Sequence, residues 1–306
     1  MTITSRLLAY TVGRVFPRFR TLGQWAHIYR KIIDGKPIEE KTKENRRVTL
    51  NHVLRGLGAH SCISSIRPHQ ISAMVACVHK ARPQLSKRVL IETKDIFSEA
   101  VGYGWIDRNP AHSIKAPVVH VTRNRLTLEQ WRLIHAHAKE HMPGWVCRMM
   151  VLALVTGQRR SDLAAMKFSD VWDGHLHVIQ EKTGARLALP TALRLDALDI
   201  TLDQAIAACR GYYTGDEYLL RKHNGKPPVL ASFSARFQDA RNEVLPMPKS
   251  GLPASLHECR SLSERLYRTQ GVNTMILLGH KHQAMTDLYN DDRGLTAGQW
   301  KTLSIA

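Results

Sequence analysis

The sequence predicts a mainly α-helical protein with a small antiparallel β-sheet, and three observations support this fold class. Apolar residues recur at helical spacing along most of the chain. Residues 171–190 differ, because turn signals there separate short apolar runs. Proline and arginine residues over 116–126 interrupt both patterns, so we expect a linker between a helical domain at 21–115 and a mixed α+β domain at 127–306. A short extension, residues 1–20, precedes the first domain.

Four helices are expected in the first domain. Their apolar residues lie three or four positions apart, which places them on one face of each helix, and lysines and arginines occupy the other faces. No strand alternation appears before residue 115, so this domain is expected to contain helices alone. The four expected helices are Trp25–Ile33, Thr42–Leu57, Pro68–His79 and Leu85–Val101.

The second domain is expected to open with a helix at Thr127, because Gln130 three residues later completes a capping box. A buried helix over Trp145–Val155 follows, and Gly157 is suited to end it. The next helix is expected to be capped by Ser161-Asp162 and to begin at Leu163.

Short strands come next in the pattern. Asp173-Gly174 and Lys182-Thr183-Gly184 are both turn signals, and they predict three antiparallel strands with Lys182 at one tip. Helical patterns return after Asp196. Ser255 and Glu258 have capping-box spacing, which predicts a helix from Leu256. A further helix, Asn273–Leu278, is expected to end at Gly279.

Positive charge is the strongest signal of the composition. The formal net charge is +18 and the pI is about 10.0. Residues 1–120 hold 20 lysines and arginines against 8 acidic residues, a net +12. This favours a polyanionic partner, and nucleic acid over a merely solubilising surface. The first domain is the part expected to grip phosphates.

The remaining composition excludes several classes of protein. The longest apolar stretch, Met149–Val155, is far too short to span a bilayer, so no membrane partner is expected. Five cysteines without a Cys-x-x-Cys pair fit a reducing compartment, so we expect a cytoplasmic protein. An organelle transit peptide is the alternative for the acid-free start, although the helix pattern from Trp25 argues that the fold begins there. No Walker loop or metal-binding histidine spacing is present, so no cofactor is expected.

Three candidate residues suit an anion. Arg159 follows a helix end, and its planar guanidinium matches a phosphate. His257 and Arg260 lie three positions apart, beside the N–H groups of an expected helix N-terminus. Taken alone, Arg159 is as typical of a polar surface as of a functional site, and the His257–Arg260 pair is more typical of an exposed polar face.

The other candidates are Lys182 on its turn, His280 after Gly279, and Tyr289 nine residues later. A lone tyrosine is most often a packing residue. The order of the candidates is more informative: Arg, Lys on a β-turn, His-x-x-Arg, then Gly-His with Tyr.

This order, with its surrounding motifs, resembles the tyrosine recombinase (phage integrase) family. The resemblance covers residues 125–306 and, more loosely, the helical part before them. The motifs that carry it are T-G-Q-R-R-S-D-L, M-K-F-S-D-V-W-D-G, E-K-T-G, A-L-P-T-A-L, L-H-E-C-R-S-L-S-E-R-L-Y, L-L-G-H-K and Y-N-D-D-R-G.

The resemblance implies a helical core-type DNA-binding domain followed by a catalytic domain. It implies that Tyr289 is the nucleophile and that Arg159 and Arg260 clamp the scissile phosphate, with His280 bonding a non-bridging oxygen. Such donors stabilise the negative charge that grows in the transition state. The implied product is a 3′-phosphotyrosine, which keeps the bond energy and needs neither metal nor ATP.

Three further roles are implied. Lys182 would protonate the leaving 5′-oxygen, because an alkoxide leaves poorly without an acid. His257 would assist proton transfer, and Asp162 would support the site from behind.

The resemblance also implies partners. They are double-stranded DNA with inverted core-type sites and a homo-tetramer on that DNA, in which the tail 294–306 is exchanged between protomers. A DNA-bending or directionality protein is a further partner in some systems of this kind. Some 20 residues precede the core-type pattern, too few for a separate arm-DNA-binding domain, so binding to distant arm sites is an open question and a simpler recombination system is an alternative.

The expected function is therefore site-specific recombination that integrates or excises a phage or mobile element. Two alternatives remain at this stage. A type IB topoisomerase-like enzyme would use the same residues to relax DNA, and a DNA-binding regulator would keep the fold without the chemistry.

Overall fold

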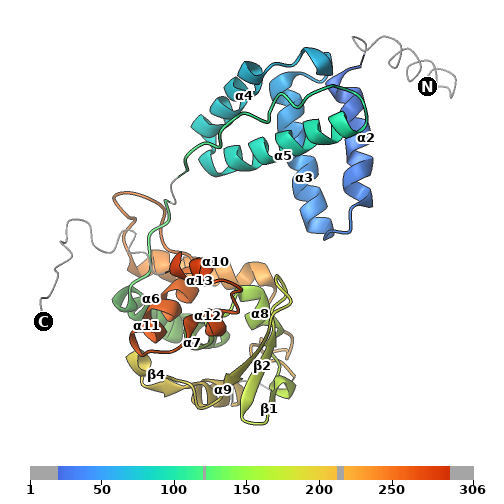
Figure 1. Cartoon of the computed structure of the whole chain (residues 1–306). Helices are drawn as coiled ribbons and strands as arrows, with labels where there is room; N and C mark the ends of the chain where they lie inside the picture. The colour runs from blue at the N-terminus through green and yellow to red at the C-terminus, as the bar shows by residue number, and fades with distance from the viewer. Residues whose placement is uncertain (1–19, 120–121, 212–216, 290–306) are drawn as a thin grey trace, which may run out of the picture. The chain divides into compact units, whose positions relative to one another are not determined.

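The computed structural model describes residues 20–119, 122–211 and 217–289, and it divides the chain into two compact units, residues 1–121 and 122–306 (Figure 1). The fold class predicted from the sequence, mainly helical with small antiparallel sheets, is confirmed. No helix in the described ranges is long and apolar enough to cross a membrane. The short extension 1–20, apart from Arg20, lies outside the described residues.

The regular elements in the described part of unit 1 are all helical. Trp25, Tyr29, Leu50 and Phe97 are among its fully buried side chains, and they come from three different helices. Its elements are α2 (Leu22–Gly35), α3 (Glu40–Leu57), the 3-10 turn η2 (Ile63–Ser65), α4 (Pro68–Ala81) and α5 (Pro83–Gly102).

Unit 2 combines helices with two small antiparallel sheets. Its first elements are α6 (Leu128–His141), α7 (Trp145–Thr156), α8 (Arg160–Ala165), η3 (Phe168–Asp170), β1 (Val171–Trp172), β2 (His175–Ile179), β3 (Arg186–Pro190), β4 (Arg194–Leu195), η4 (Asp196–Leu198) and β5 (Ile200–Thr201). It continues with α9 (Leu202–Arg210), α10 (Leu230–Val244), α11 (Glu258–Thr269), α12 (Thr274–Leu278) and α13 (Gln283–Asp287).

The three-stranded sheet has the order β1-β2-β3, and His175 pairs with Pro190 while Ile179 pairs with Arg186. Both predicted turns lie between its strands. A second sheet of β4 and β5 was not predicted, because each of its strands is only two residues long and leaves no alternation to detect.

Two helix starts predicted from capping residues are wrong. Helix α8 begins at Arg160, with Arg159 as its N-cap in an extended conformation, so Asp162 lies inside the first turn and accepts the Arg159 N–H at 3.3 Å. Helix α11 begins at Glu258 with His257 as N-cap, and Ser255 makes no side-chain cap there. The Glu258 carboxylate pairs with Arg125 instead, at 3.0 Å.

Part of the expected linker belongs to unit 2. Asn124 N–H donates to the Leu252 carbonyl at 2.9 Å, and Leu252 N–H donates to Thr122 at 2.7 Å. Leu126 is fully buried. These contacts attach residues 122–126 to the second unit.

Candidate active site

A cavity of about 680 Å³ in unit 2 gathers most of the predicted site residues. Residues from five separate segments line it, and the predicted ones among them are Arg159, Lys182, His257, His280 and Tyr289. Arg260 and Asp162 are 1% and 2% exposed and form no part of this lining. The structure therefore separates groups that face the cavity from groups that lie behind its wall.

Two glycines in the left-handed conformation shape the wall. Gly157 ends α7 with φ 64°, and Gly279 ends α12 with φ 62°. The chain turns sharply at each, so Arg159 and His280 follow a helix end directly. A side chain at Gly157 would lie 3.0 Å from atoms of Leu278 and Ser263, which shows how closely the two turns approach.

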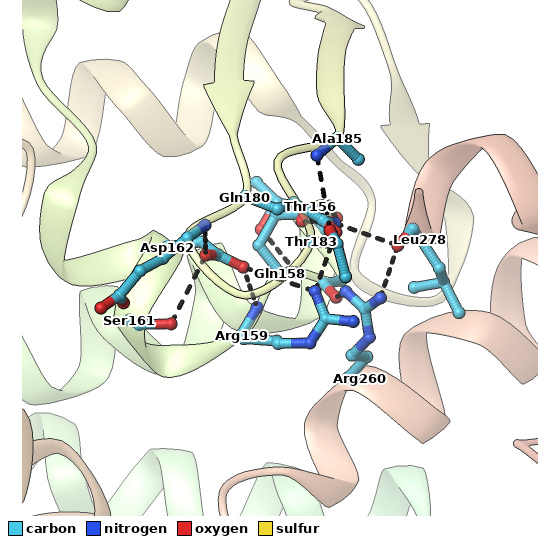
Figure 2. Close-up of polar contacts among 12 residues, drawn as sticks. Thr156, Gln158, Arg159, Ser161, Asp162, Gln180, Thr183, Ala185, Arg260 and Leu278 are labelled. Atoms are coloured by element: carbon cyan, nitrogen blue, oxygen red, sulfur yellow. Dashed lines mark hydrogen bonds and ion pairs between the residues drawn. The ribbon is translucent and has the colours of Figure 1, made fainter. Parts of the chain in front are cut away.

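Arg260 is held rigidly by backbone. Its Nη1 donates to the Gly157 carbonyl at 2.6 Å and its Nη2 to the Leu278 carbonyl at 2.5 Å (Figure 2). Its buried Nε has no hydrogen-bond partner among the described residues. Burial and, next, the nearby Arg159 lower the pKa of Arg260 to about 10. It remains charged at neutral pH, with an unused donor.

His280 is locked by two neighbours. Arg260 Nη2 lies 3.2 Å from its Nε2, and Thr286 Oγ1 lies 2.9 Å from its Nδ1. A guanidinium only donates, so Nε2 accepts and Nδ1 carries the hydrogen that Thr286 receives. Desolvation, then Arg260 and Arg159, lower the pKa of His280 to about 4, so the ring is neutral at pH 7.

Tyr289 lies against both histidines. Its ring stacks on His280, with centroids 5.5 Å apart, and its hydroxyl lies 3.4 Å from His257 Nε2. Desolvation, followed by Arg260, Arg159 and Lys182, lowers the pKa of His257 to about 4. A neutral imidazole that faces a tyrosine hydroxyl can accept its proton.

The backbone around Tyr289 is also fixed. Ser261 Oγ donates to the Tyr289 carbonyl at 3.0 Å, and Arg125 Nη2 donates to the Leu288 carbonyl at 2.6 Å. Arg125 in turn pairs with Glu258 in the interior. The tyrosine is thus held by the start of α11 and by a residue expected to lie in the linker.

Lys182 and Asp162 have different settings. Lys182 is exposed on the turn between β2 and β3 and lines the cavity. Asp162 accepts the backbone N–H of Arg159 at 3.3 Å and that of Glu181 at 3.1 Å, and its carboxylate lies 3.9 Å from Arg159 Nη1. It therefore connects the arginine to the lysine turn.

The sequence reasoning missed several residues that hold the site together. They are Arg125, Gln158, Gln180, Ser261 and Thr286. Four of them are hydrogen-bonded to a predicted site residue or to its chain neighbour, and Gln158 is bonded to Gln180. Glutamine, serine and threonine occur throughout the chain, so no spacing distinguished them. Among the described residues no group of three or more His, Cys, Asp or Glu is arranged to hold a metal.

A mainly helical unit with a small antiparallel sheet, and a tyrosine beside a cavity of cationic side chains, defines a tyrosine recombinase. Residues 124–294 match the phage integrase family. Prophage integrase IntE of Escherichia coli K12 is 38% identical over 290 residues, which cover 90% of this chain and 76% of that protein. The chain belongs to the phage integrase family.

Solved structures agree with this assignment. A lambda integrase dimer bound to a COC′ core site has a TM-score of 0.87 and 33% identity, over 98% of this chain and 84% of that one. A lambda integrase tetramer bound to a Holliday junction has a TM-score of 0.86 and 32% identity, with the same coverage.

Breaking the buried Arg125–Glu258 pair is expected to destabilise unit 2 strongly. Both side chains are at most 6% exposed, so Glu258→Gln leaves a desolvated guanidinium without its carboxylate, at a cost of about 3–5 kcal/mol. Urea denaturation measures the change. The control is Asp239→Asn, which breaks a half-exposed pair with Arg236 and should cost at most about 0.5 kcal/mol. Equal effects would show that burial of the first pair contributes nothing.

Stability is expected to rise with pH between about 4 and 6.5. The unfolded histidines take up protons near pH 6.5, whereas His280 in the folded chain does so only near pH 4. The unfolded state therefore binds more protons in this window, so the folded state gains stability as pH rises through it, and the gain is complete above about pH 6.5. Unfolding free energies at several pH values measure the slope, and His280→Asn should reduce it. An unchanged slope in that variant would contradict the shift.

Proposed function

We propose that the chain cuts and rejoins DNA at specific sites through Tyr289. The hydroxyl oxygen attacks the scissile phosphorus, the bond to the 5′-oxygen breaks, and a 3′-phosphotyrosine forms. His257 takes the hydroxyl proton and Lys182 gives one to the leaving oxygen. The observation that carries this proposal is the Tyr289 hydroxyl 3.4 Å from His257 Nε2, at a cavity that Arg159 and Lys182 also line.

The cations have distinct roles in this proposal. Arg159 has further N–H groups beyond the one bound to Gln180, and these are available for a non-bridging oxygen. Arg260 supplies positive charge from behind the cavity wall. Its Nε, which has no partner among the described residues, is a further donor for the phosphate. An incoming phosphate carries negative charge, which raises the pKa of His280 and favours a form that donates from Nε2.

Unit 1 is proposed to grip the duplex. Its net charge supports this role, because lysines and arginines outnumber acidic residues by 12 over residues 1–120. The likeness to lambda integrase bound to a core site and to a Holliday junction supports core-type sites and a tetramer on DNA. The tail 294–306, which the sequence analysis assigned to exchange between protomers, lies outside the described residues.

A nicked duplex that carries DNA from beside the gene tests this function. Strand cleavage on such a substrate releases a short piece of DNA and traps the covalent adduct, which a denaturing gel displays. We expect the adduct and recombinants between two such sites, with no added metal or ATP. Relaxation of plasmids without that sequence and without recombinants would instead indicate topoisomerase-like activity. Site binding without any cleavage would indicate a regulator.

A further inference from the structure

The buried side chain of Gln180 lies at the junction of the site's segments. The residue follows β2 and is completely buried, although it adjoins the exposed turn of Lys182. Its backbone closes that turn, because its N–H donates to Ala185 at 2.9 Å and its carbonyl accepts from Gly184 at 2.8 Å. The position of Lys182 thus depends on where Gln180 is held.

All four hydrogen-bonding positions of the Gln180 amide are used. Oε1 accepts from Arg159 Nη1 at 2.8 Å and from Thr183 Oγ1 at 2.7 Å. Nε2 donates to Gln158 Oε1 at 2.8 Å and to the Leu278 carbonyl at 3.0 Å (Figure 2). The orientation of the amide is dictated by these partners, because a guanidinium only donates and a carbonyl only accepts.

The network extends to the second arginine. The Leu278 carbonyl accepts from Arg260 Nη2 as well as from Gln180. Gln158 is also buried, and its Nε2 donates to the carbonyls of Thr156 and Leu277, both at 2.9 Å. Gln180 therefore contacts one arginine directly and shares an acceptor with the other.

Gly279 permits this close contact. A Cβ at that position would lie 2.9 Å from Gln180 Nε2, and the φ of 62° already favours glycine. The helix end that presents His280 is therefore pressed against the amide.

A neutral amide suits this place better than a carboxylate. It fixes the direction of Arg159 through one of the five guanidinium N–H groups and leaves the arginine's charge unopposed. A carboxylate would neutralise that charge beside Asp162, which is already 3.9 Å from Arg159 Nη1. It would also remove the donor to Gln158 Oε1 and one of the two donors to the Leu278 carbonyl.

We propose that Gln180 is a positioning residue for strand cleavage: its amide sets the direction of Arg159 and joins the Lys182 turn to the end of α12. This inference rests on the function proposed above. It predicts that loss of the amide acts through Arg159. The loss should slow the chemical step without lowering the affinity for duplex DNA.

Gln180→Met tests this, because methionine has a similar size but cannot make the four bonds. We expect the single-turnover cleavage rate at saturating nicked duplex to fall about 10²-fold, with the Kd for intact duplex changed less than about threefold. Gln180→Glu keeps the size and adds the charge, and it should be slowed at least as much.

A double-mutant cycle separates positioning from general damage. In an Arg159→Ala background, Gln180→Met should slow cleavage little further, because the residue it positions is gone. Gln270→Met is the matched control: its amide also bridges two segments of unit 2, at Asp196 N–H and the Arg194 carbonyl, and contacts none of the site residues.

Near-wild-type cleavage by both Gln180 variants would overturn the inference while the proposed function stands. Full additivity with Arg159→Ala, or equal slowing by Gln270→Met, would also overturn it. The proposed function fails separately, if the wild-type chain forms no adduct. Should Gln180→Met fail to fold, the rate and the cycle measured with Gln180→Glu decide by the same criteria.

Discussion

Tyr289→Phe is expected to reduce the covalent protein–DNA adduct to background. The substitution removes one oxygen and keeps the ring that stacks on His280, so the site retains its packing. The lost hydroxyl is the group that faces His257 Nε2 at 3.4 Å. We expect the Kd for duplex DNA to stay within about twofold, because the ring and all cations remain. Denaturing gels of the nicked substrate measure the adduct.

Tyr218→Phe is the matched control, since this tyrosine also belongs to unit 2 and lies beside Lys167 rather than at the cavity. Its adduct should form at the wild-type rate. Adduct formation by Tyr289→Phe, or loss of it in Tyr218→Phe, would remove Tyr289 from the role of nucleophile.

Alanine substitutions of Arg159 and Arg260 are expected to have different effects. Arg159→Ala should slow cleavage about 10²–10³-fold, the usual effect of deleting one donor to a transition-state oxyanion, with little change in stability. Arg260→Ala should abolish detectable cleavage and also lower the melting temperature. Its guanidinium donates to two backbone carbonyls in the interior, so the substitution removes the donor to the Gly157 carbonyl and leaves the Leu278 carbonyl with Gln180 alone.

Arg160→Ala provides the control for charge. Arg160 also lines the cavity and adjoins Arg159, but its Nη1 donates to Ser234 on α10. Removing it deletes the same charge from the same segment, and we expect less than tenfold loss of cleavage. Comparable losses for both arginines would mean that total charge matters rather than the direction of Arg159. Duplex binding should stay within tenfold for all three variants.

The local parts of the fold were predictable because local chemistry decides them. Gly157 and Gly279 ended helices where expected, and Thr127 with Gln130 formed its capping box. The start of α11 was not predictable, because the Glu258 carboxylate binds a distant residue rather than a backbone N–H of its own helix. Its carboxylate pairs with Arg125, 133 positions away, so the capping-box spacing of Ser255 and Glu258 is not used.

The candidate site likewise has residues that the sequence predicts and residues that only the fold brings together. The site residues were recognisable from their order along the chain, because these residue types rarely follow one another in this order. They are Arg159, Lys182, His257, Arg260, His280 and Tyr289. The amides that orient them were not, since Gln158 and Gln180 acquire meaning only when four segments meet. The difference between the accessible Arg159 and the enclosed Arg260 likewise depends on burial, which spacing does not reveal.

Mapping the DNA-linked residue by mass spectrometry is the most direct measurement of the central claim. The wild-type chain would be trapped on a nicked duplex, the DNA trimmed with nuclease, and the protein digested to peptides. The account predicts one modified peptide, with the residual nucleotide joined through a 3′-phosphate to the oxygen of Tyr289. A nucleotide on any other residue, or a cleaved strand with no linked peptide, would contradict it.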